Sequence, residues 1–221
     1  MRGLLRCCRE ELLCALGGAV SLGWLLLLVP ICWNGAASWN GSGVPLLLSL
    51  HLLTAVGAAV ASGLCWPFSG PFALERTSGR PAWQSVGGRL LFWAGLIGAG
   101  AALQQIFLHI SLAEFGDVWP RIWSDGAERV SRLERWASWE GALTVLALGM
   151  GAYVSALTIA LWCRNCRSPR RRSLGGAVVL TLLFGYLLLF LARGVPLWLL
   201  GTAVTILGAA ASCWLLEHRS E

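Results

Sequence analysis

Six long apolar stretches, each of 19 to 23 residues and none with an Asp, Glu, Lys or Arg, constrain this 221-residue chain more than any other feature. A helix needs about 20 apolar residues to cross the roughly 30 Å hydrocarbon core of a bilayer. Each stretch is continuous rather than alternating, which is typical of a membrane helix and not of a β-barrel strand. We therefore predict an all-α integral membrane protein, a six-helix transmembrane bundle with spans at 12–33, 44–66, 90–112, 141–163, 174–192 and 195–216.

Two parts of this assignment have alternatives. The first stretch follows a basic start, as in a signal peptide, but it is longer than the usual apolar core of about 7–15 residues. Glu10 and Glu11 also precede it. The fifth and sixth stretches are separated only by Arg193 and Gly194, and Pro196 suits the first turn of a new helix. We expect a tight helical hairpin there, with a single long bent insertion as the alternative.

The distribution of Arg predicts the orientation, because basic residues are enriched in cytoplasmic loops. All 17 basic residues are Arg. With both termini in the cytoplasm, 12 of them lie inside and 5 outside, and the net charge is +7 inside and −1 outside. The overall charge of +6 then belongs to one membrane face and does not indicate a nucleic-acid-binding protein. The inner basic cluster is either a topology anchor or a contact for anionic lipid head groups, and its members are Arg164, Arg167, Arg170, Arg171 and Arg172.

The eight Cys residues are unevenly distributed in this topology, with seven near the inner boundary and only Cys32 near the outer one. One outer Cys cannot form an intrachain disulfide framework. Juxtamembrane Cys beside Arg suits reversible S-palmitoylation, with unmodified thiols as the alternative. A four-thiolate zinc site is a third possibility, but a single CxxC is a weak signal, and we expect no metal and no cofactor. The palmitoylation candidates are Cys7, Cys8, Cys163 and Cys166.

The short outer loop at 34–43 holds one N-glycosylation sequon, at Asn40. Because Asn40 lies only a few residues from both flanking spans, we expect it to be poorly glycosylated. A mobility shift after glycosidase treatment would contradict this expectation.

The long outer loop at 113–140 carries the clearest pattern outside the spans. Asp125 and Glu128 have the spacing of a helix capping box, and apolar residues recur at helical spacing over 130–137. We predict a short amphipathic interfacial helix at 126–139 on the outer leaflet, where Trp is enriched. It is either a docking surface for a partner or lipid, or a solvated connector. The candidate docking residues are Trp119, Trp123, Trp136 and Trp139.

The few polar residues within or next to the predicted spans fall in the outer half of the bilayer, and ionisable groups there are default functional candidates. Two His residues could hold a haem or a metal ion, or a His and a Glu could act on a lipid head group. Alternatively, the polar groups form cross-helix hydrogen bonds, which average about 0.6 kcal/mol in measured bundles. We favour these bonds, because the sequence shows no nucleophile elbow, HExxH helix or acidic metal cluster. The candidate site residues are His51, Gln105, His109 and Glu140.

Small residues are frequent within the spans, and they let helix backbones approach closely in lipid. Gly57 and Ala61 have small-xxx-small spacing, and we expect them to pack inside the bundle rather than on a partner. No span carries the carboxylate or Arg of an ion pathway. The sequence therefore predicts a non-enzymatic accessory or scaffold subunit for another membrane protein, in a eukaryotic endomembrane or plasma membrane. The alternative is a membrane-embedded lipid-handling enzyme or carrier that uses the polar residues of the outer half.

Overall fold

The computed structural model describes Arg9 and residues 56–69, 72, 79–122, 124, 126–165 and 196–217. Within these ranges the chain forms helices and short connections, with no strand. Three of the helices are long and apolar enough to cross a membrane, and they overlap the predicted third, fourth and sixth spans. The first and fifth predicted spans, and the start of the second, lie outside the described residues. The three helices are α5 (Ala82–Phe115), α8 (Trp139–Asn165) and α10 (Leu197–Glu217).

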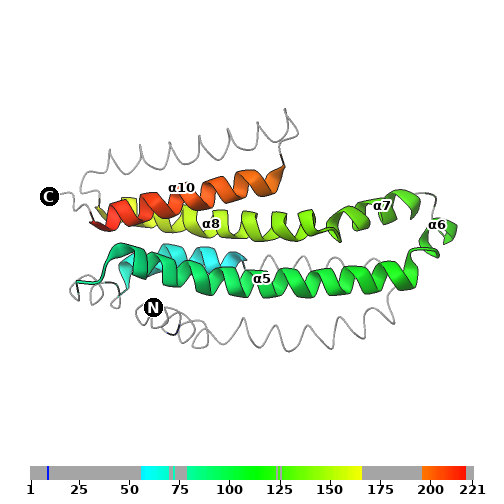
Figure 1. Cartoon of the computed structure of the whole chain (residues 1–221), viewed down its shortest axis with the longest axis horizontal. Coiled ribbons are helices and arrows are strands. Elements are labelled where there is room, and N and C mark those ends of the chain that lie inside the picture. The colour runs from blue at the N-terminus through cyan, green and yellow to red at the C-terminus, as the bar shows by residue number, and fades with distance from the viewer. Residues whose placement is uncertain are drawn as a thin grey trace.

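α8 is the central helix of the described part, with α5 on one side and α10 on the other (Figure 1). α8 and α10 run parallel to each other. Gly201, in the first half of α10, lies against Ala147, and Asn165 at the end of α8 donates to the Leu215 carbonyl oxygen at 2.7 Å. Because the two helices point the same way, Asn165 and Leu197 lie at opposite ends of the pair, and residues 166–195 between them lie outside the described structure. The predicted fifth span would connect these two ends, and it remains a prediction.

α5 runs antiparallel to α8, and two contacts define the register between them. The ring centroids of Trp93 and Tyr153 lie 6.0 Å apart. A Cβ added to Gly149 would lie 3.1 Å from Cγ2 of Ile97. Each step toward the C-terminus of α5 is therefore a step toward the N-terminus of α8, which brings Gln105 level with the first turn of α8.

α5 begins before the predicted span at 90–112, which started where Arg89 interrupts the apolar run. Pro81 immediately precedes the helix with φ −63° and ψ 139°, and its carbonyl accepts the Gln84 N–H at 3.0 Å. Proline suits this place because its fixed φ matches the start of a helix. Arg89 does not end the helix, since its side chain is only 2% exposed and is accommodated inside the bundle. With 34 residues, α5 is about 51 Å long, well above the roughly 30 Å of a bilayer core.

The long loop predicted outside the membrane contains α6 (Trp119–Ile122) and α7 (Gly126–Trp136). The helix predicted at 126–139 is therefore present, although it ends three residues earlier. α7 follows on from the line of α8 and packs beside the C-terminal part of α5 (Figure 1). The predicted position of this helix on the outer leaflet stays a prediction, and the structure adds that α7 contacts α5.

Ser138 explains why α7 and α8 are two helices rather than one. Its hydroxyl donates to the Arg135 carbonyl oxygen at 2.6 Å, in the last turn of α7. The same hydroxyl accepts the Gly141 N–H at 3.3 Å, in the first turn of α8. A side-chain oxygen that accepts from the third helical residue is the usual N-cap contact, so one side chain serves both helix ends.

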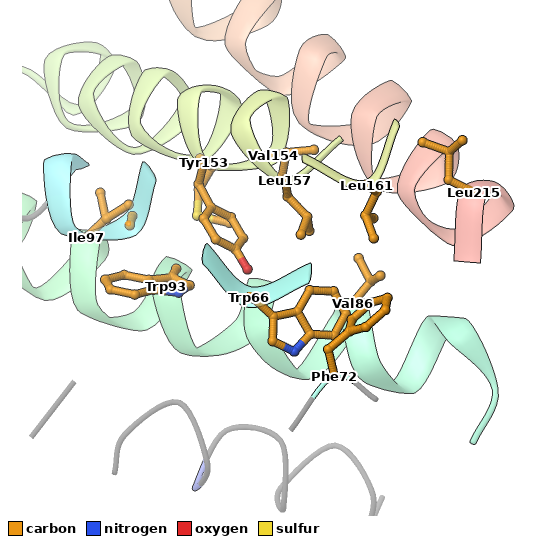
Figure 2. Close-up of a cluster of buried hydrophobic side chains, with 12 residues drawn as sticks. Trp66, Phe72, Val86, Trp93, Ile97, Tyr153, Val154, Leu157, Leu161 and Leu215 are labelled. Atoms are coloured by element: carbon orange, nitrogen blue, oxygen red, sulfur yellow. The ribbon is translucent and has the colours of Figure 1, made fainter. Parts of the chain in front are cut away.

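The apolar core lies between the helix at 56–65, α5 and α8 (Figure 2). The 56–65 helix continues into a short 3₁₀ helix, η1 (Trp66–Phe68), whose Pro67 is buried. Aromatic side chains fill much of this core, and Figure 2 shows the rings of Trp66 in η1, Phe72, Trp93 in α5 and Tyr153 in α8 on the α5-facing side of α8. The largest buried members are Trp66, Phe72, Trp93, Ile97, Tyr153, Leu157 and Leu161.

Candidate functional site

Gly151 of α8 and Gly201 and Gly208 of α10 lie in the contact between these two helices. A Cβ on Gly201 would lie 2.7 Å from the carbonyl carbon of Ala147, and a Cβ on Gly208 would collide with Cγ1 of Val154. Such distances show backbones in close approach, which only a missing side chain permits. The abundance of small residues in these two helices is therefore explained by packing within the chain.

A small polar cluster lies in the same contact. Thr158 Oγ1 is 3.1 Å from the Gly208 carbonyl oxygen and 2.9 Å from Ser212 Oγ. It also lies 2.8 Å from the Val154 carbonyl oxygen of its own helix. Hydroxyl groups in a membrane need such partners, because lipid offers no acceptor. The cluster therefore joins α8 to α10 without leaving these hydroxyl groups unsatisfied.

The glycines near the start of the described chain divide into two kinds. Gly63 packs inside, since an added Cβ would lie 3.1 Å from the Tyr153 carbonyl oxygen. Gly57 and Ala61 are exposed, and no atom lies within 4 Å of an added Cβ at Gly57. The prediction that Gly57 and Ala61 pack inside the bundle finds no contact among the described residues, and it stays a prediction because the predicted first and fifth spans lie outside them. Spacing alone does not show which face of a helix is turned inward, and here Gly63 takes the internal position.

α5 carries a second group of small residues on a face that is exposed in the described part of the structure. Gly95 is exposed, and no atom lies within 4 Å of the position of an added Cβ. Ala99 and Ala102 follow on the same exposed side at helical spacing. We call Gly95, Ala99 and Ala102 the small face of α5. Apolar side chains at Leu91 and Ile106, both more than half exposed, continue this face in both directions.

The polar residues predicted as a site do not all have the same environment. Gln105 Nε2 donates to the Trp136 carbonyl oxygen at 2.8 Å. This carbonyl belongs to the last turn of α7, where carbonyls lack partners within the helix, so Gln105 ties α7 to α5. His109 and Glu140 are exposed, and His51 lies outside the described residues.

The register of α5 also changes the depth expected for these groups. If α8 crosses the bilayer at 141–163, the level segment of antiparallel α5 is about 82–104 rather than 90–112. Gln105 then lies at the outer boundary and His109 beyond it. The small face of α5 lies inside this segment, at the depth of the hydrocarbon core.

The structure describes the side chains of two of the four Trp residues proposed for docking, and both lie at this outer end. Trp136 is 47% exposed and Trp139 is 65% exposed. The ring of Trp139 lies 6.4 Å from that of Trp198, centroid to centroid, which joins the start of α8 to the start of α10. The sequence analysis did not single out Trp198. The side chains of Trp119 and Trp123 lie outside the described part of the structure.

The opposite end of the bundle holds a cluster that the sequence analysis largely missed. Trp66 and Phe72 form an edge-to-face pair with ring centroids 4.9 Å apart and planes at 80°. The guanidinium carbon of Arg89 lies 4.0 Å from the Trp66 centroid, and that of Arg164 lies 4.1 Å from the Phe72 centroid. We call these four residues the aromatic–arginine cluster. The available signal was an aromatic Trp66-Pro67-Phe68 segment closing an apolar stretch.

Arg89 reaches this cluster by extending along its own helix. Its Nη1 donates to the Ser85 carbonyl oxygen at 3.4 Å, one turn toward the start of α5. A long cationic side chain in an apolar segment commonly extends in this way toward the membrane surface. Of the predicted lipid-contacting residues, only Arg164 is described, and the others, Arg167, Arg170, Arg171 and Arg172, lie outside the described residues.

Three Cys residues belong to the described part, and all three are free thiols. Cys163, a palmitoylation candidate, is half-buried near the end of α8. Cys65 is exposed beside Trp66, at the same end of the bundle. The other candidates, Cys7, Cys8 and Cys166, lie outside the described residues, as does Asn40.

No protein-family model, curated protein or solved structure matches this chain.

Proposed function

We propose that the chain is a membrane-embedded accessory or scaffold subunit that binds a transmembrane helix of another membrane protein through the small face of α5. The observation that supports this proposal is the open space at Gly95, where no atom lies within 4 Å of an added Cβ. Helices in lipid associate by close van der Waals contact, and small residues allow that approach. A partner helix at this depth would find a flat strip of backbone.

The cost of glycine in a helix strengthens the argument. Gly is about 1 kcal/mol less favourable than Ala in a helix interior. At Gly63, Gly201 and Gly208 a contact within the chain accounts for the glycine, because a Cβ would meet a neighbouring helix. At Gly95 no such contact exists in the described structure. A partner helix whose backbone packs at this position would explain why a glycine is present at Gly95.

The proposal is tested by copurification from membranes in mild detergent. Gly95→Leu and Ala99→Leu fill the small face and are expected to lose a partner that the wild-type chain retains in fixed stoichiometry. Ala203→Leu is the matched control, because Ala203 is an equally exposed small residue on α10. Since Gly95 touches nothing in the described structure, we expect its substitution to leave the chain folded. Equal partner recovery from all three variants contradicts docking at this face.

A six-span arrangement with both termini in the cytoplasm, in a eukaryotic endomembrane or plasma membrane, belongs to the same proposal. The distribution of Arg supports the orientation. The directions of the described helices agree with it, since the 56–65 helix, α8 and α10 point one way and α5 the other. S-palmitoylation of Cys7, Cys8, Cys163 and Cys166 would add lipid anchors on the inner face.

The alternative function, a lipid-handling enzyme or carrier, would need His51, Gln105, His109 and Glu140 to face one substrate. Gln105 is engaged with the Trp136 carbonyl oxygen, which favours a packing role for this residue. No observation on the described residues favours the enzyme, and the scaffold function is therefore the one we propose.

A further inference from the structure

We propose that the aromatic–arginine cluster binds the phosphate of an acidic phospholipid in the leaflet at that end of the bundle. Two guanidinium groups, one from α5 and one from α8, rest on the two rings of a single aromatic pair. Neither helix could place both charges alone. The fold therefore concentrates positive charge at one point on the end of the bundle, and this inference does not depend on the docking of a partner helix.

The chemistry of the cluster fits an anion with several oxygen acceptors. Guanidinium and indole groups carry only hydrogen-bond donors. The Trp66 indole N–H is buried and meets no acceptor in the structure as described. Figure 2 shows its nitrogen on the side of the ring turned away from Tyr153 and Leu161, and so away from α8. A phosphate oxygen would give this donor the acceptor it lacks.

The two Arg residues would have different roles: Arg89 provides a buried positive charge, and Arg164 contacts the phosphate directly. Arg89 is 2% exposed and supplies the buried positive charge of the cluster. Arg164 is half-buried, with one face of its guanidinium on Phe72. Because stacking holds the plane of a guanidinium while its edge stays available, Arg164 can donate two parallel hydrogen bonds to one phosphate.

The surroundings of the cluster favour a lipid over a free phosphate ion. Phe68 is 63% exposed, Trp83 53% and Leu64 42%, and these residues flank the cluster in η1, in the first turn of α5 and in the 56–65 helix. Exposed aromatic and aliphatic side chains at a helix end suit the boundary between head groups and acyl chains. A ligand with a phosphate and a hydrocarbon tail satisfies both parts of the site.

The test measures lipid retained by the full chain after reconstitution in an equimolar mixture of phosphatidylcholine and phosphatidylserine, by native mass spectrometry. We expect the wild-type chain to retain phosphatidylserine in preference. Arg164→Gln should lower that preference about tenfold, because it removes charge-assisted bonds to phosphate. Arg164→Lys keeps the charge without the planar fork and should fall between the two. Trp66→Phe keeps the ring, removes the N–H and should lower the preference about threefold.

Arg121→Gln is the control, since Arg121 is exposed in α6 at the other end and its loss changes the net charge equally. If Trp66→Phe does not fold, the comparison of Arg164→Gln with Arg121→Gln still distinguishes a local phosphate site from a bulk charge effect. An equal loss of preference in both Arg variants would show a bulk charge effect and overturn the site. Displacement of the retained lipid from the wild-type chain by inorganic phosphate would assign the cluster to a soluble anion and overturn the lipid proposal.

Discussion

The same substitution, Gly to Ala, is expected to have opposite effects at two positions of this bundle. At Gly201 an added Cβ would lie 2.7 Å from the carbonyl carbon and 2.8 Å from the carbonyl oxygen of Ala147. Ordinary contact begins near 3.4 Å, so α8 and α10 would have to separate by about 0.7 Å at this point. At Gly95 no atom lies within 4 Å, and the methyl group meets nothing.

The two contributions set the size of each effect. Overpacking a tight contact costs about 1–3 kcal/mol, while replacing a helical Gly by Ala gains about 1 kcal/mol. For Gly201→Ala the net result is a loss of about 1 kcal/mol and at most about 2 kcal/mol. For Gly95→Ala only the gain remains, about 0.5–1 kcal/mol.

The assay is reversible unfolding in mixed micelles of mild detergent and SDS, followed by Trp fluorescence, with both variants and the wild-type chain measured together. Gly201→Ala should unfold at lower SDS and Gly95→Ala at higher SDS than the wild-type chain. Shifts in the same direction would refute the distinction between internal and open glycines. A Gly201→Ala chain that unfolds at the same SDS concentration as the wild-type chain, or at a higher one, would refute the close parallel contact of α8 and α10.

Three further perturbations probe other parts of the structure. Thr158→Val removes the hydroxyl that joins α8 to α10 and should lower the free energy of unfolding by about 0.6 kcal/mol in the same assay. An unchanged free energy of unfolding would show that this hydroxyl does not stabilise the helix contact. Gln105→Leu leaves the Trp136 carbonyl oxygen without its donor and should cost about 1 kcal/mol, seen as faster amide hydrogen exchange at the junction of α7 and α8. Unchanged exchange would show that this bond does not hold the junction. Cys65 and Cys163 lie at the same end of the bundle, so an impermeant maleimide should label both only after the plasma membrane is permeabilised; labelling of one in intact cells would break the proposed orientation.

The amino-acid sequence was sufficient to predict the three long apolar helices that the structure describes, but not how they pack against one another. A continuous apolar run decides that a segment is a membrane helix, because each residue contributes independently to its transfer into lipid. The boundary at Arg89 could not be predicted in this way. Its burial depends on Trp66, which lies in another helix, and hydropathy summed along one helix does not include such a partner. The continuation of α5 through Arg89 is consistent with that cross-helix contact, while Pro81 marks where the helix begins.

The candidate site shows a similar division. Small residues in the spans indicate close helix contacts, and α8 and α10 form one. The pattern is nevertheless identical for an internal and an external face, so it did not distinguish Gly57 and Ala61, which are exposed in the described structure, from the internal Gly63. Gln105 was identified as a polar residue of interest, but its acceptor is a backbone carbonyl oxygen, which no side-chain pattern records. Backbone acceptors at helix ends become apparent only when the neighbouring helix is in place.

The contact between α8 and α10 joins residues that are synthesised at different times. The residues that meet across this contact, such as Thr158 and Ser212, are 54 positions apart in the chain. At about 5–20 residues per second, the ribosome needs roughly 3 to 10 seconds between them. During that interval the face of α8 that carries Ala147, Val154 and Thr158 is in the membrane without its permanent neighbour. A chain that stops before residue 197 lacks α10 and therefore every contact that this face makes with it.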